Sequence, residues 1–367
     1  MKIHKEQFAS ILSTLRAERR LTQRALVEPL GFSEKTVSKW ECGAAIPDVE
    51  TLFSIGEVLG VPIEALFADG KHYYLGIDGG GTKTELALAD ATGRILRTHR
   101  TGACNPVDIG LERAKEILRD AVCEVCRGIP ASSISAFAGI AGGSTSGVRE
   151  ELASFFSSFG FAHVLNDSDN RNIIAAGLGE RDGMTVILGT GFCIYTQAAG
   201  VHRRISGWGY LLDDGGSGYN LGRDALHANY AAYDGTGEKT LLTEEIDRIR
   251  PGGADALLPY VYSEGKRAIA SFAPTVFAAC EKGDRIANAI LERNVVLAAS
   301  LIERAATTLE GERIPIVLAG GLTNETRMMT LLLDALKKDP RLCVELLRCE
   351  PVKGALLLAM ELERNAV

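Results

Sequence analysis

The sequence predicts an all-α domain at the N-terminus followed by a duplicated α/β body. Up to residue 67, short stretches carry apolar residues at helical spacing, as in a compact helical bundle. From Tyr73 onward, short apolar runs alternate with glycine-rich turns, and the order strand, glycine turn, strand, turn, strand begins once at Tyr73 and again at Met184. Two copies of one unit imply two similar half-domains with a cleft between them.

The composition is that of an ordinary globular protein. The chain has 367 residues, 46% of them hydrophobic, and a net charge of −7, so two or three domains are expected and a general nucleic-acid-coating role is excluded. No apolar run reaches the roughly 18 residues that span a bilayer, and charges stand where a signal peptide is apolar. The eight cysteines are scattered, as in a reducing compartment. We therefore expect a cytoplasmic protein without a membrane partner.

The helical domain is expected to span residues 1–70 and to end in a polar linker at residues 68–71. Thr22 can cap a second helix that runs to Leu30, and Ser33 can cap a third that runs to Glu41. The sequence of this region, LTQRALVEPLGFSEKTVSKWECGAAIPDVETL, resembles the Cro/repressor-type helix-turn-helix family along nearly its whole length.

This resemblance implies that the domain binds a double-stranded DNA operator, with the third helix in the major groove. By position, Gln23 would contact the phosphate backbone, and Lys35, Thr36 and Lys39 would face bases and phosphates. The alternative is a bundle that serves protein contact or dimerisation and has lost DNA binding. Pro29 favours that alternative, because the family usually has a helix former in the last turn of the second helix.

The stretch YYLGIDGGGTKTELALAD, residues 73–90, predicts a strand, a tight turn and a second strand. Three adjacent glycines let backbone N–H groups converge on an anion without steric cost. A carboxylate precedes them, and a hydroxyl and an ammonium follow, so phosphate with Mg²⁺ is the natural ligand. A phosphate loop of the usual kind runs into a helix, whereas here a strand follows. An ordinary glycine-rich hairpin is the alternative. The predicted turn consists of Asp78, Gly79, Gly80, Gly81, Thr82, Lys83 and Thr84.

Several segments together resemble the sugar kinase, Hsp70 and actin superfamily, which has a duplicated ribonuclease H-like ATPase fold with an interlobe cleft. The resemblance is closer to its BadF-type branch, which includes N-acetylglucosamine and N-acetylmuramic acid kinases. It extends from about Tyr73 to the C-terminus and implies a first lobe at residues 72–182 and a second at 183–367, with a C-terminal helix that could return to the first lobe. The motifs are DGGGTKT (78–84), GTG (189–191), GWGYLLDDGGS (207–217), AGG (319–321) and PVKGA (351–355).

The resemblance implies ATP-dependent phosphorylation of an amino sugar of the N-acetylglucosamine or N-acetylmuramic acid type, at the 6-hydroxyl. Asp78 would hold Mg²⁺, and Asp169 would be the catalytic base. Asp167 is a rival for that role, and either aspartate could instead merely cap the helix that follows. The residues expected to bind ATP are Gly79, Gly80, Gly81, Thr82, Lys83, Gly189, Thr190, Gly191, Gly320 and Gly321.

The same resemblance implies a sugar site with hydrogen-bonding groups and one aromatic wall. Cys193 stands where the N-acetylglucosamine kinase pattern has an asparagine, which leaves the identity of the sugar open. The residues expected to bind the sugar are Asn105, Asp169, Gly191, Trp208 and Asp214.

Three functions are compatible with this combination of domains. The first is an active amino-sugar kinase that also regulates transcription, acting as a homodimer. The second is a transcription regulator whose kinase-like body only senses a sugar or sugar phosphate. The third, an ATPase that activates a radical dehydratase, needs cysteines that share an iron–sulfur cluster between subunits. Cys123 and Cys126 lie in a helical pattern and suit that role poorly.

Overall fold

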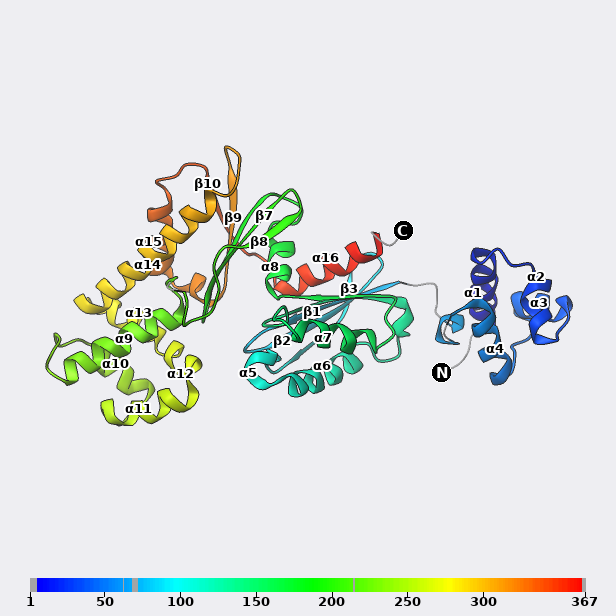
Figure 1. Ribbon diagram of the computed structural model, residues 1–367, viewed down its shortest axis with the longest axis horizontal. Helices are drawn as coiled ribbons and strands as arrows, with labels where there is room; N and C mark the ends of the chain where they lie inside the picture. The colour runs from blue at the N-terminus through cyan, green and yellow to red at the C-terminus, as the bar shows by residue number, and fades with distance from the viewer. Residues whose placement is uncertain (1–4, 62, 68–71, 214, 365–367) are drawn as a thin grey trace. The chain divides into compact units, whose positions relative to one another are not determined.

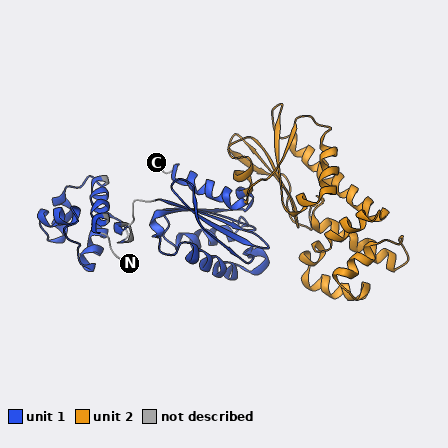
Figure 2. Ribbon diagram, turned by 180° about the vertical axis from the view of Figure 1, so that it is seen from behind, with its two compact units in different colours: residues 1–172, 351–367 blue, residues 173–350 orange. Residues whose placement is uncertain are grey.

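The computed structural model describes residues 5–61, 63–67, 72–213 and 215–364 (Figure 1). Contacts divide the chain into two compact units, of which unit 1 contains residues 1–172 and 351–367 and unit 2 contains residues 173–350 (Figure 2). The polar linker that the sequence predicts at residues 68–71 lies outside the described residues. Among the helices within the described ranges, none has the length and apolar character needed to cross a lipid bilayer.

The N-terminal part of unit 1 is a helical bundle, as predicted. Its core consists of apolar side chains from the four α-helices and from the 3₁₀ turn at Ile63–Phe67, namely Phe8, Leu12, Leu26, Val27, Val37, Trp40, Leu52, Ile55, Leu59 and Leu66. Its elements are α1 (Lys5–Glu18), α2 (Gln23–Val27), η1 (Glu28–Leu30), α3 (Glu34–Glu41), α4 (Val49–Leu59) and η2 (Ile63–Phe67).

The second helix of the bundle is shorter than the sequence predicts. α2 ends at Val27, and a 3₁₀ turn continues to Leu30. Pro29 has no N–H to extend the α-helical hydrogen bonds, which favours the early end. Gly31 then takes φ 72°, a left-handed conformation that glycine adopts at little cost. The third helix ends at Glu41, as predicted.

The rest of unit 1 is a five-stranded mixed sheet with strand order β3-β2-β1-β4-β5. The first three strands form an antiparallel meander, and β4 and β5 run parallel to β1. The strands are β1 (Tyr73–Gly79), β2 (Thr84–Asp90), β3 (Ile95–Thr101), β4 (Ile134–Ile140) and β5 (His163–Asp167), and the helices are α5 (Pro106–Ile109), α6 (Leu111–Val125), η3 (Ala131–Ser133), α7 (Val148–Ser157) and α16 (Pro351–Arg364).

Helices cover both faces of this sheet (Figure 1). On one face, α6 and α7 pack against alternate residues of the central strands, including Leu75 and Ile77. On the other face, the C-terminal helix α16 approaches β1 so closely that a Cβ on Gly76 would lie 2.7 Å from the Leu356 nitrogen. Glycine at position 76 therefore permits the C-terminal helix to pack directly on the sheet of the first half-domain.

Unit 2 repeats the topology of this sheet. Its strand order is β10-β9-β6-β7-β8, with an antiparallel meander from β6 to β8 and two strands parallel to β6. The duplication predicted from the two glycine hairpins is thus confirmed. The strands are β6 (Gly183–Leu188), β7 (Phe192–Ala198), β8 (Val201–Arg204), β9 (Ile314–Ala319) and β10 (Leu342–Leu346).

A helical region follows the meander of unit 2 and supplies most of its large apolar core. Long helices with buried faces, such as α9 and α14, pack together there. The helices are α9 (Gly218–Tyr233), α10 (Leu242–Ile249), α11 (Gly253–Glu264), α12 (Lys266–Ala270), α13 (Ala273–Glu281), α14 (Arg285–Ala306), η4 (Gly321–Asn324) and α15 (Thr326–Leu336).

The division between the units differs from the predicted one at residues 182 and 183. It falls inside α8 (Asn170–Gly177), between residues 172 and 173. The second half of α8 belongs to unit 2, because Ile174 and Leu178 pack against Val317 of β9.

Candidate functional site

The first glycine turn joins β1 to β2, as predicted, and is fixed from several directions. The Gly80 nitrogen donates a hydrogen bond to the Lys83 carbonyl oxygen at 2.8 Å, and the Gly80 carbonyl accepts one from the Cys104 nitrogen at 3.2 Å. A Cβ on Gly79 would lie 2.5 Å from Cys104 Sγ and 2.6 Å from Ile140 Cδ1. A side chain at position 79 would have to displace the Cys104 thiol and the Ile140 side chain, so glycine lets the turn lie close to both.

Asp78 lies at the carboxyl end of β1, opposite Gly139 of β4, and Gly139 in turn lies opposite Asp167 of β5. The space above Gly139 is filled by the side chain of Asn172, whose amide atoms would lie 2.3 and 2.4 Å from a Cβ at position 139. Asn172 is fully buried, and its Nδ2 donates hydrogen bonds to Asp78 Oδ1 at 2.7 Å and to the Ile77 carbonyl at 3.2 Å. Asn172 thus orients the Asp78 carboxylate.

The surroundings of Asp78 favour a cation. Burial of the carboxyl group raises the pKa of Asp78 to about 7, although the hydrogen bond from Asn172 opposes the shift. The negative charges of Asp169 and Glu85 raise this pKa further, while the Lys83 ammonium lowers it. The Glu85 Oε2 atom is also buried without a hydrogen-bond partner among the described residues. A bound cation would stabilise the ionised form of Asp78.

These groups fit a Mg²⁺ site in which the protein and a bound phosphate both supply ligands. Mg²⁺ commonly takes one or two carboxylates, several waters and substrate phosphates instead of a closed set of protein ligands. Within the described ranges, no group of three or more His, Cys, Asp or Glu side chains is placed to hold a metal ion by itself. Asp78, next to a turn that can bind phosphate, is therefore suited to hold the ion directly or through water.

Asp169 and Asp167 have different environments. The Asp167 carboxylate accepts a hydrogen bond from the Ser168 nitrogen at 2.7 Å and lies 3.6 Å from Arg149 Nη2. The charge of Asp169 instead acts on the glycine turn, because it raises the pKa of Asp78. Burial raises the pKa of the Cys104 thiol to about 11, and the charges of Asp78 and Asp169 add to that shift. Asp169 is thus electrostatically coupled to the turn, whereas Asp167 forms an ion pair with Arg149.

Asn105 lies beside the glycine turn, at the start of α5. Its Oδ1 caps the helix by accepting a hydrogen bond from the Val107 nitrogen at 3.0 Å, and its Nδ2 donates to Asp108 Oδ2 at 2.8 Å. The same Asp108 oxygen would lie 3.4 Å from a Cβ on Gly81. Asn105 is also close to Gly142, where a Cβ would lie 2.5 Å from Asn105 Oδ1. Unit 1 therefore brings Asn105 and the first glycine turn together.

Lys83 pairs with a carboxylate of its own hairpin, since its Nζ lies 2.8 Å from Glu85 Oε1. Thr82 occupies the same turn. The adjacent Thr84 begins β2, and its hydroxyl donates to the Gly102 carbonyl at 2.7 Å. The ammonium group that would meet a phosphate is therefore held close to the turn by Glu85.

The second glycine turn, Gly189 to Gly191, joins β6 to β7 in unit 2, as predicted. The start of α9 lies against it, because the Gly218 nitrogen donates to the Gly189 carbonyl at 2.8 Å and the Tyr219 nitrogen donates to the Thr190 carbonyl at 3.0 Å. Within the described residues, the N–H groups of Thr190 and Gly191 donate no hydrogen bond. They remain free to bind an anion.

The glycine pair after β9 approaches the same turn. Gly320 has φ 99°, and a Cβ there would lie 2.4 Å from the Leu188 carbonyl oxygen and 3.1 Å from the Gly189 nitrogen. Both the backbone conformation and the close approach therefore require glycine. Gly321 begins η4 and has open space around its Cα. Unit 2 thus brings Gly320 into contact with the second glycine turn.

Trp208 lies on an exposed loop of unit 2 that Asp213 stabilises. Asp213 Oδ2 accepts hydrogen bonds from the Trp208 nitrogen and, at 2.8 Å, from the Gly207 nitrogen. The indole is 60% exposed, and the Arg204 guanidinium lies 4.9 Å from its ring centre. Cys193 lies directly beneath this loop, because a Cβ on Gly207 would be 2.3 Å from Cys193 Cβ. Asp214, which the sequence places in the sugar site, lies outside the described residues.

In the helical bundle, Gln23 begins α2 and donates through Nε2 to Glu41 Oε2 at 2.8 Å. Burial opposes the ionisation of Glu41, but the hydrogen bonds from Arg16 and Gln23 outweigh it and lower the pKa of Glu41. Part of the Gln23 amide is thus used within the bundle. It keeps one N–H and its carbonyl for another partner.

The DNA-facing candidates of α3 have different surroundings. Lys35 and Lys39 are exposed, make no side-chain hydrogen bond or ion pair within the described residues, and lie four residues apart on one helix face. Thr36 is half-buried, and its hydroxyl is 3.0 Å from the Ser33 hydroxyl. Two unpaired cations therefore project from the third helix.

Asn172 and Asp108 are site neighbours that the sequence prediction missed. Asn172 follows Asp169 by three residues and lies in the first turn of α8, where its nitrogen donates to the Asp169 carbonyl at 3.1 Å, so its distance from Asp169 in the sequence is a signal that could have found it. Asp108 follows Asn105 by the same interval, and the two side chains are joined by a hydrogen bond. Both residues look like ordinary polar helix positions until their partners are known.

Comparison with known proteins agrees with this architecture. The chain is 27% identical over 303 residues to an N-acetylmuramic acid/N-acetylglucosamine kinase of Clostridium acetobutylicum, covering 78% of this chain and 98% of the relative. It is 30% identical over 315 residues to an N-acetyl-D-glucosamine kinase of Dictyostelium discoideum, covering 79% of this chain and 98% of that relative. The crystal structure of a candidate N-acetylglucosamine kinase from Chromobacterium violaceum superimposes with a TM-score of 0.66 at 26% identity, over 78% of this chain and 99% of that one.

Family models account for both parts of the chain. Residues 12–66 match a helix-turn-helix family, in agreement with the N-terminal bundle. Residues 75–359 match the BadF/BadG/BcrA/BcrD ATPase family, and this segment contains both duplicated sheets with their glycine turns. With most of its length matched and its fold shared with sugar kinase-like ATPases, this chain belongs to the BadF/BadG/BcrA/BcrD ATPase family.

Proposed function

We propose that the body of this chain is a kinase that transfers the γ-phosphoryl group of ATP to an amino sugar of the N-acetylglucosamine or N-acetylmuramic acid type. The observation that carries the proposal is the buried Asp78 carboxylate, which Asn172 orients by a 2.7 Å hydrogen bond at the first glycine turn and whose pKa burial and the charge of Asp169 both raise. One carboxylate suits a metal ion, and the other suits a proton acceptor. The kinases named among its relatives support the substrate class.

Each carboxylate has a distinct role in this reaction. Asp169 would accept the proton of the sugar hydroxyl as that oxygen forms a bond to the γ-phosphorus and the bond to ADP breaks. Asp78, oriented by Asn172, would hold Mg²⁺ directly or through water. Mg²⁺, when bound, neutralises charge on the phosphates. Asn105 would hydrogen-bond the sugar through its second Nδ2 hydrogen and the second lone pair of Oδ1, which its contacts with α5 do not use.

The backbone would supply most of the phosphate contacts. In unit 2, the N–H groups of Thr190 and Gly191 are free, and Gly320 lies against the same turn. In unit 1, the first glycine turn, Gly79 to Thr82, is the other candidate for phosphate contacts, although its Gly80 nitrogen already donates to the Lys83 carbonyl. Backbone donors of this kind bind phosphate oxygens at no cost in side-chain entropy.

The experiment is ADP release from the purified chain with Mg²⁺-ATP and a panel of amino sugars. Asp169→Asn should lower kcat by about 10²- to 10⁴-fold, because the general base is lost. Asp167→Asn is the matched control and should keep most of the activity, since Asp167 pairs with a half-exposed Arg149 instead. Phosphorus–proton correlation in the NMR spectrum of the product tests whether the 6-hydroxyl is the acceptor.

A different result would identify a sensor. If sugars raise the melting temperature but none stimulates ADP release, the body binds a sugar or sugar phosphate without turnover. If Asp167→Asn abolishes turnover and Asp169→Asn does not, the assignment of the base is wrong. Because Cys193 replaces the family's asparagine, the sugar panel also measures which amino sugar this chain prefers.

We also propose that the N-terminal domain binds double-stranded DNA and that the chain acts as a homodimer in transcription regulation. The support is the helix-turn-helix match and the two unpaired lysines on α3. Selection from a random oligonucleotide library should enrich a two-fold symmetric site, with half-sites about 10 base pairs apart or a multiple of that spacing. If no sequence is enriched over a chain lacking residues 1–67, DNA binding is excluded.

A further inference from the structure

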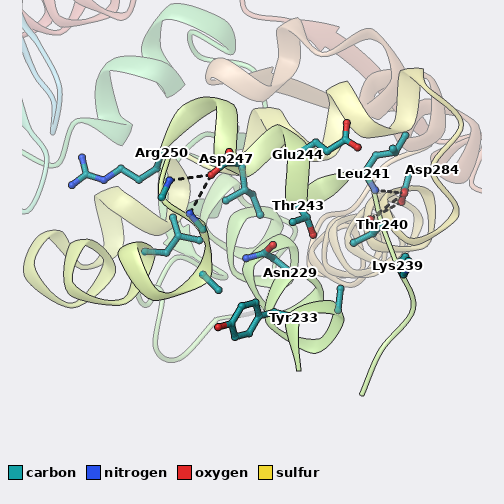
Figure 3. Close-up of a pocket in the computed structure, with 16 residues that line it drawn as sticks. Asn229, Tyr233, Lys239, Thr240, Leu241, Thr243, Glu244, Asp247, Arg250 and Asp284 are labelled. Carbon is teal, nitrogen blue, oxygen red and sulfur yellow. Dashed lines mark hydrogen bonds between the residues drawn. The ribbon is translucent and has the colours of Figure 1, made fainter. Parts of the chain in front are cut away.

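A large cavity lies in the helical region of unit 2, bounded by the end of α9, by α10 and by the start of α11 (Figure 3). Its volume is about 910 Å³. Asn229, which lines it, stands eleven residues after Gly218, the residue of α9 that contacts the second glycine turn. At 1.5 Å per helical residue, this separation is about 16 Å along one helix. The cavity is therefore separate from the phosphate-binding turn of its own unit.

Two of the three acidic side chains of the wall, Asp284 and Asp247, are used to hold it together, whereas the exposed Glu244 makes no side-chain hydrogen bond or ion pair within the described residues. Asp284 accepts hydrogen bonds from the Thr240 hydroxyl at 3.0 Å and from the Leu241 nitrogen at 2.7 Å. Asp247 accepts them from the nitrogens of Gly252 at 3.1 Å and Gly253 at 3.2 Å (Figure 3). These carboxylates fix the segments before α10 and α11. They leave little capacity for a ligand.

Asn229 is different, because its amide has no internal partner. The residue is 3% exposed, and its side chain makes no hydrogen bond with any described residue. Figure 3 shows the amide among the side chains that line the cavity, with no interaction drawn to it. Buried asparagine amide nitrogens normally have acceptors, as Asn294 Nδ2 does in donating to Asp224 Oδ2 and to the Ile290 carbonyl, both at 2.9 Å. The Asn229 amide is therefore available to hydrogen-bond a ligand in the cavity.

The other lining groups indicate the class of that ligand. The floor is apolar, with Ile246 and Leu257 each 1% exposed. Thr243 offers a hydroxyl, and Tyr233 offers an aromatic ring that is 63% exposed. An aromatic ring covers the C–H face of a sugar, while an amide and a hydroxyl bind its hydroxyl groups. The volume lies within the range of about 300 to 1,000 Å³ that is usual for small-molecule sites.

We propose that this cavity is a second ligand site, which binds an uncharged carbohydrate of one or two rings through Asn229 and Thr243. Two cationic side chains line it, Lys239 and Arg250, and both are exposed, with the Arg250 guanidinium 4.4 Å from the centre of the Tyr260 ring. A neutral ligand therefore fits better than a phosphorylated one. The proposal does not depend on the kinase activity, because a binding site of this kind needs no turnover.

Hydrogen–deuterium exchange on the full chain tests the site with four sugars, namely glucose, N-acetylglucosamine, cellobiose and chitobiose, each at millimolar concentration. At least one of them should protect the segments of α10 and the start of α11. The same protection should need at least about tenfold more sugar in Thr243→Val and in Asn229→Leu, because each loses a hydrogen bond to the ligand. Sugar-dependent ADP release, if present, should not change in either variant.

The melting temperatures of matched variants separate a ligand role from a structural one. Asn229→Leu should melt at or above the temperature of the native chain, since no internal hydrogen bond is lost. Asn294→Leu should melt several degrees lower, because two hydrogen bonds are lost. The proposal is overturned if Asn229→Leu melts as low as Asn294→Leu, or if no sugar protects the segments. It also fails if self-association alone gives the same protection, because a second copy would then cover the cavity.

Discussion

Asn172 Nδ2 donates a hydrogen bond to Asp78 Oδ1 at 2.7 Å, across Gly139 of β4, where a Cβ would meet the Asn172 amide. The contact joins residues that are 94 positions apart in the chain. It holds a carboxylate with a raised pKa in one orientation beside the first glycine turn. Asn172 is therefore a positioning residue for Asp78, and its effects should appear in the ionisation of that group.

Replacement of Asn172 by alanine should raise the pKa of Asp78 above its value of about 7, because the hydrogen bond that favours the carboxylate is lost. If activity requires ionised Asp78, the rising limb of the pH profile of kcat/KM should move to higher pH. The variant should also lose about 1 to 3 kcal/mol of stability, since buried carbonyls lose their donor.

Gly139→Ala provides an independent check of the same relationship. The added Cβ would displace the Asn172 amide without removing it, because the two would be separated by only about 2.3 Å. The pH profile should move in the same direction as in Asn172→Ala. An unchanged profile in both folded variants would show that Asn172 does not control Asp78.

Asp78 should make the stability of the free chain fall as the pH rises. Its pKa is about 7 in the folded chain and 3.8 as the ordinary value. Below the lower value the group is protonated in both states, and between the two values only the unfolded chain ionises, so stability declines until the pH passes about 7. At 1.36 kcal/mol per pH unit, the full decline is at most about 4 kcal/mol.

Urea unfolding of the native chain and of Asp78→Asn measures this effect. Between about pH 5 and about pH 8, the decline should be smaller in Asp78→Asn by about 2 to 3 kcal/mol, because the asparagine does not titrate. The comparison is made without nucleotide or divalent ions. Equal pH dependence in the two proteins would mean that Asp78 ionises normally in the folded chain.

Gly320 and Gly321 form a matched pair for testing the second glycine turn. Gly320→Ala should destabilise unit 2 by several kcal/mol and raise the KM for ATP, because the new Cβ would meet the Leu188 carbonyl at 2.4 Å and φ is 99°. Gly321→Ala should change the stability by less than about 1 kcal/mol, because its Cα faces open space. Similar losses in both variants would contradict the close approach of Gly320 to the turn.

The sequence was sufficient to predict the two glycine hairpins, because each combines strand-like runs with a turn composition that few other structures use. The duplication of the sheets followed from their repetition. The contact between Asn172 and Asp78 could not be predicted, because it depends on the folded chain placing the Asn172 side chain against Gly139 of β4. The apolar spacing predicted a helix up to Leu30, but α2 ends at Val27, because Pro29 cannot donate a helical hydrogen bond. The cavity around Asn229 arises from the packing of three helices and has no local sequence pattern.

The two exposed lysines of α3 should contribute to DNA affinity and not to folding. Lys35→Ala and Lys39→Ala should each leave the melting temperature unchanged, because neither side chain has a partner within the described residues. If both contact phosphates, each variant should reduce the slope of log K against log salt concentration by about 1, because one fewer counterion is released on binding. Lys338→Ala, at an exposed position of unit 2, is the control and should bind the selected DNA as the native chain does. A variant that weakens binding to one sequence without changing the salt slope would indicate a base contact in place of a phosphate contact.

If neither lysine variant weakens binding, α3 is not the helix that contacts the DNA.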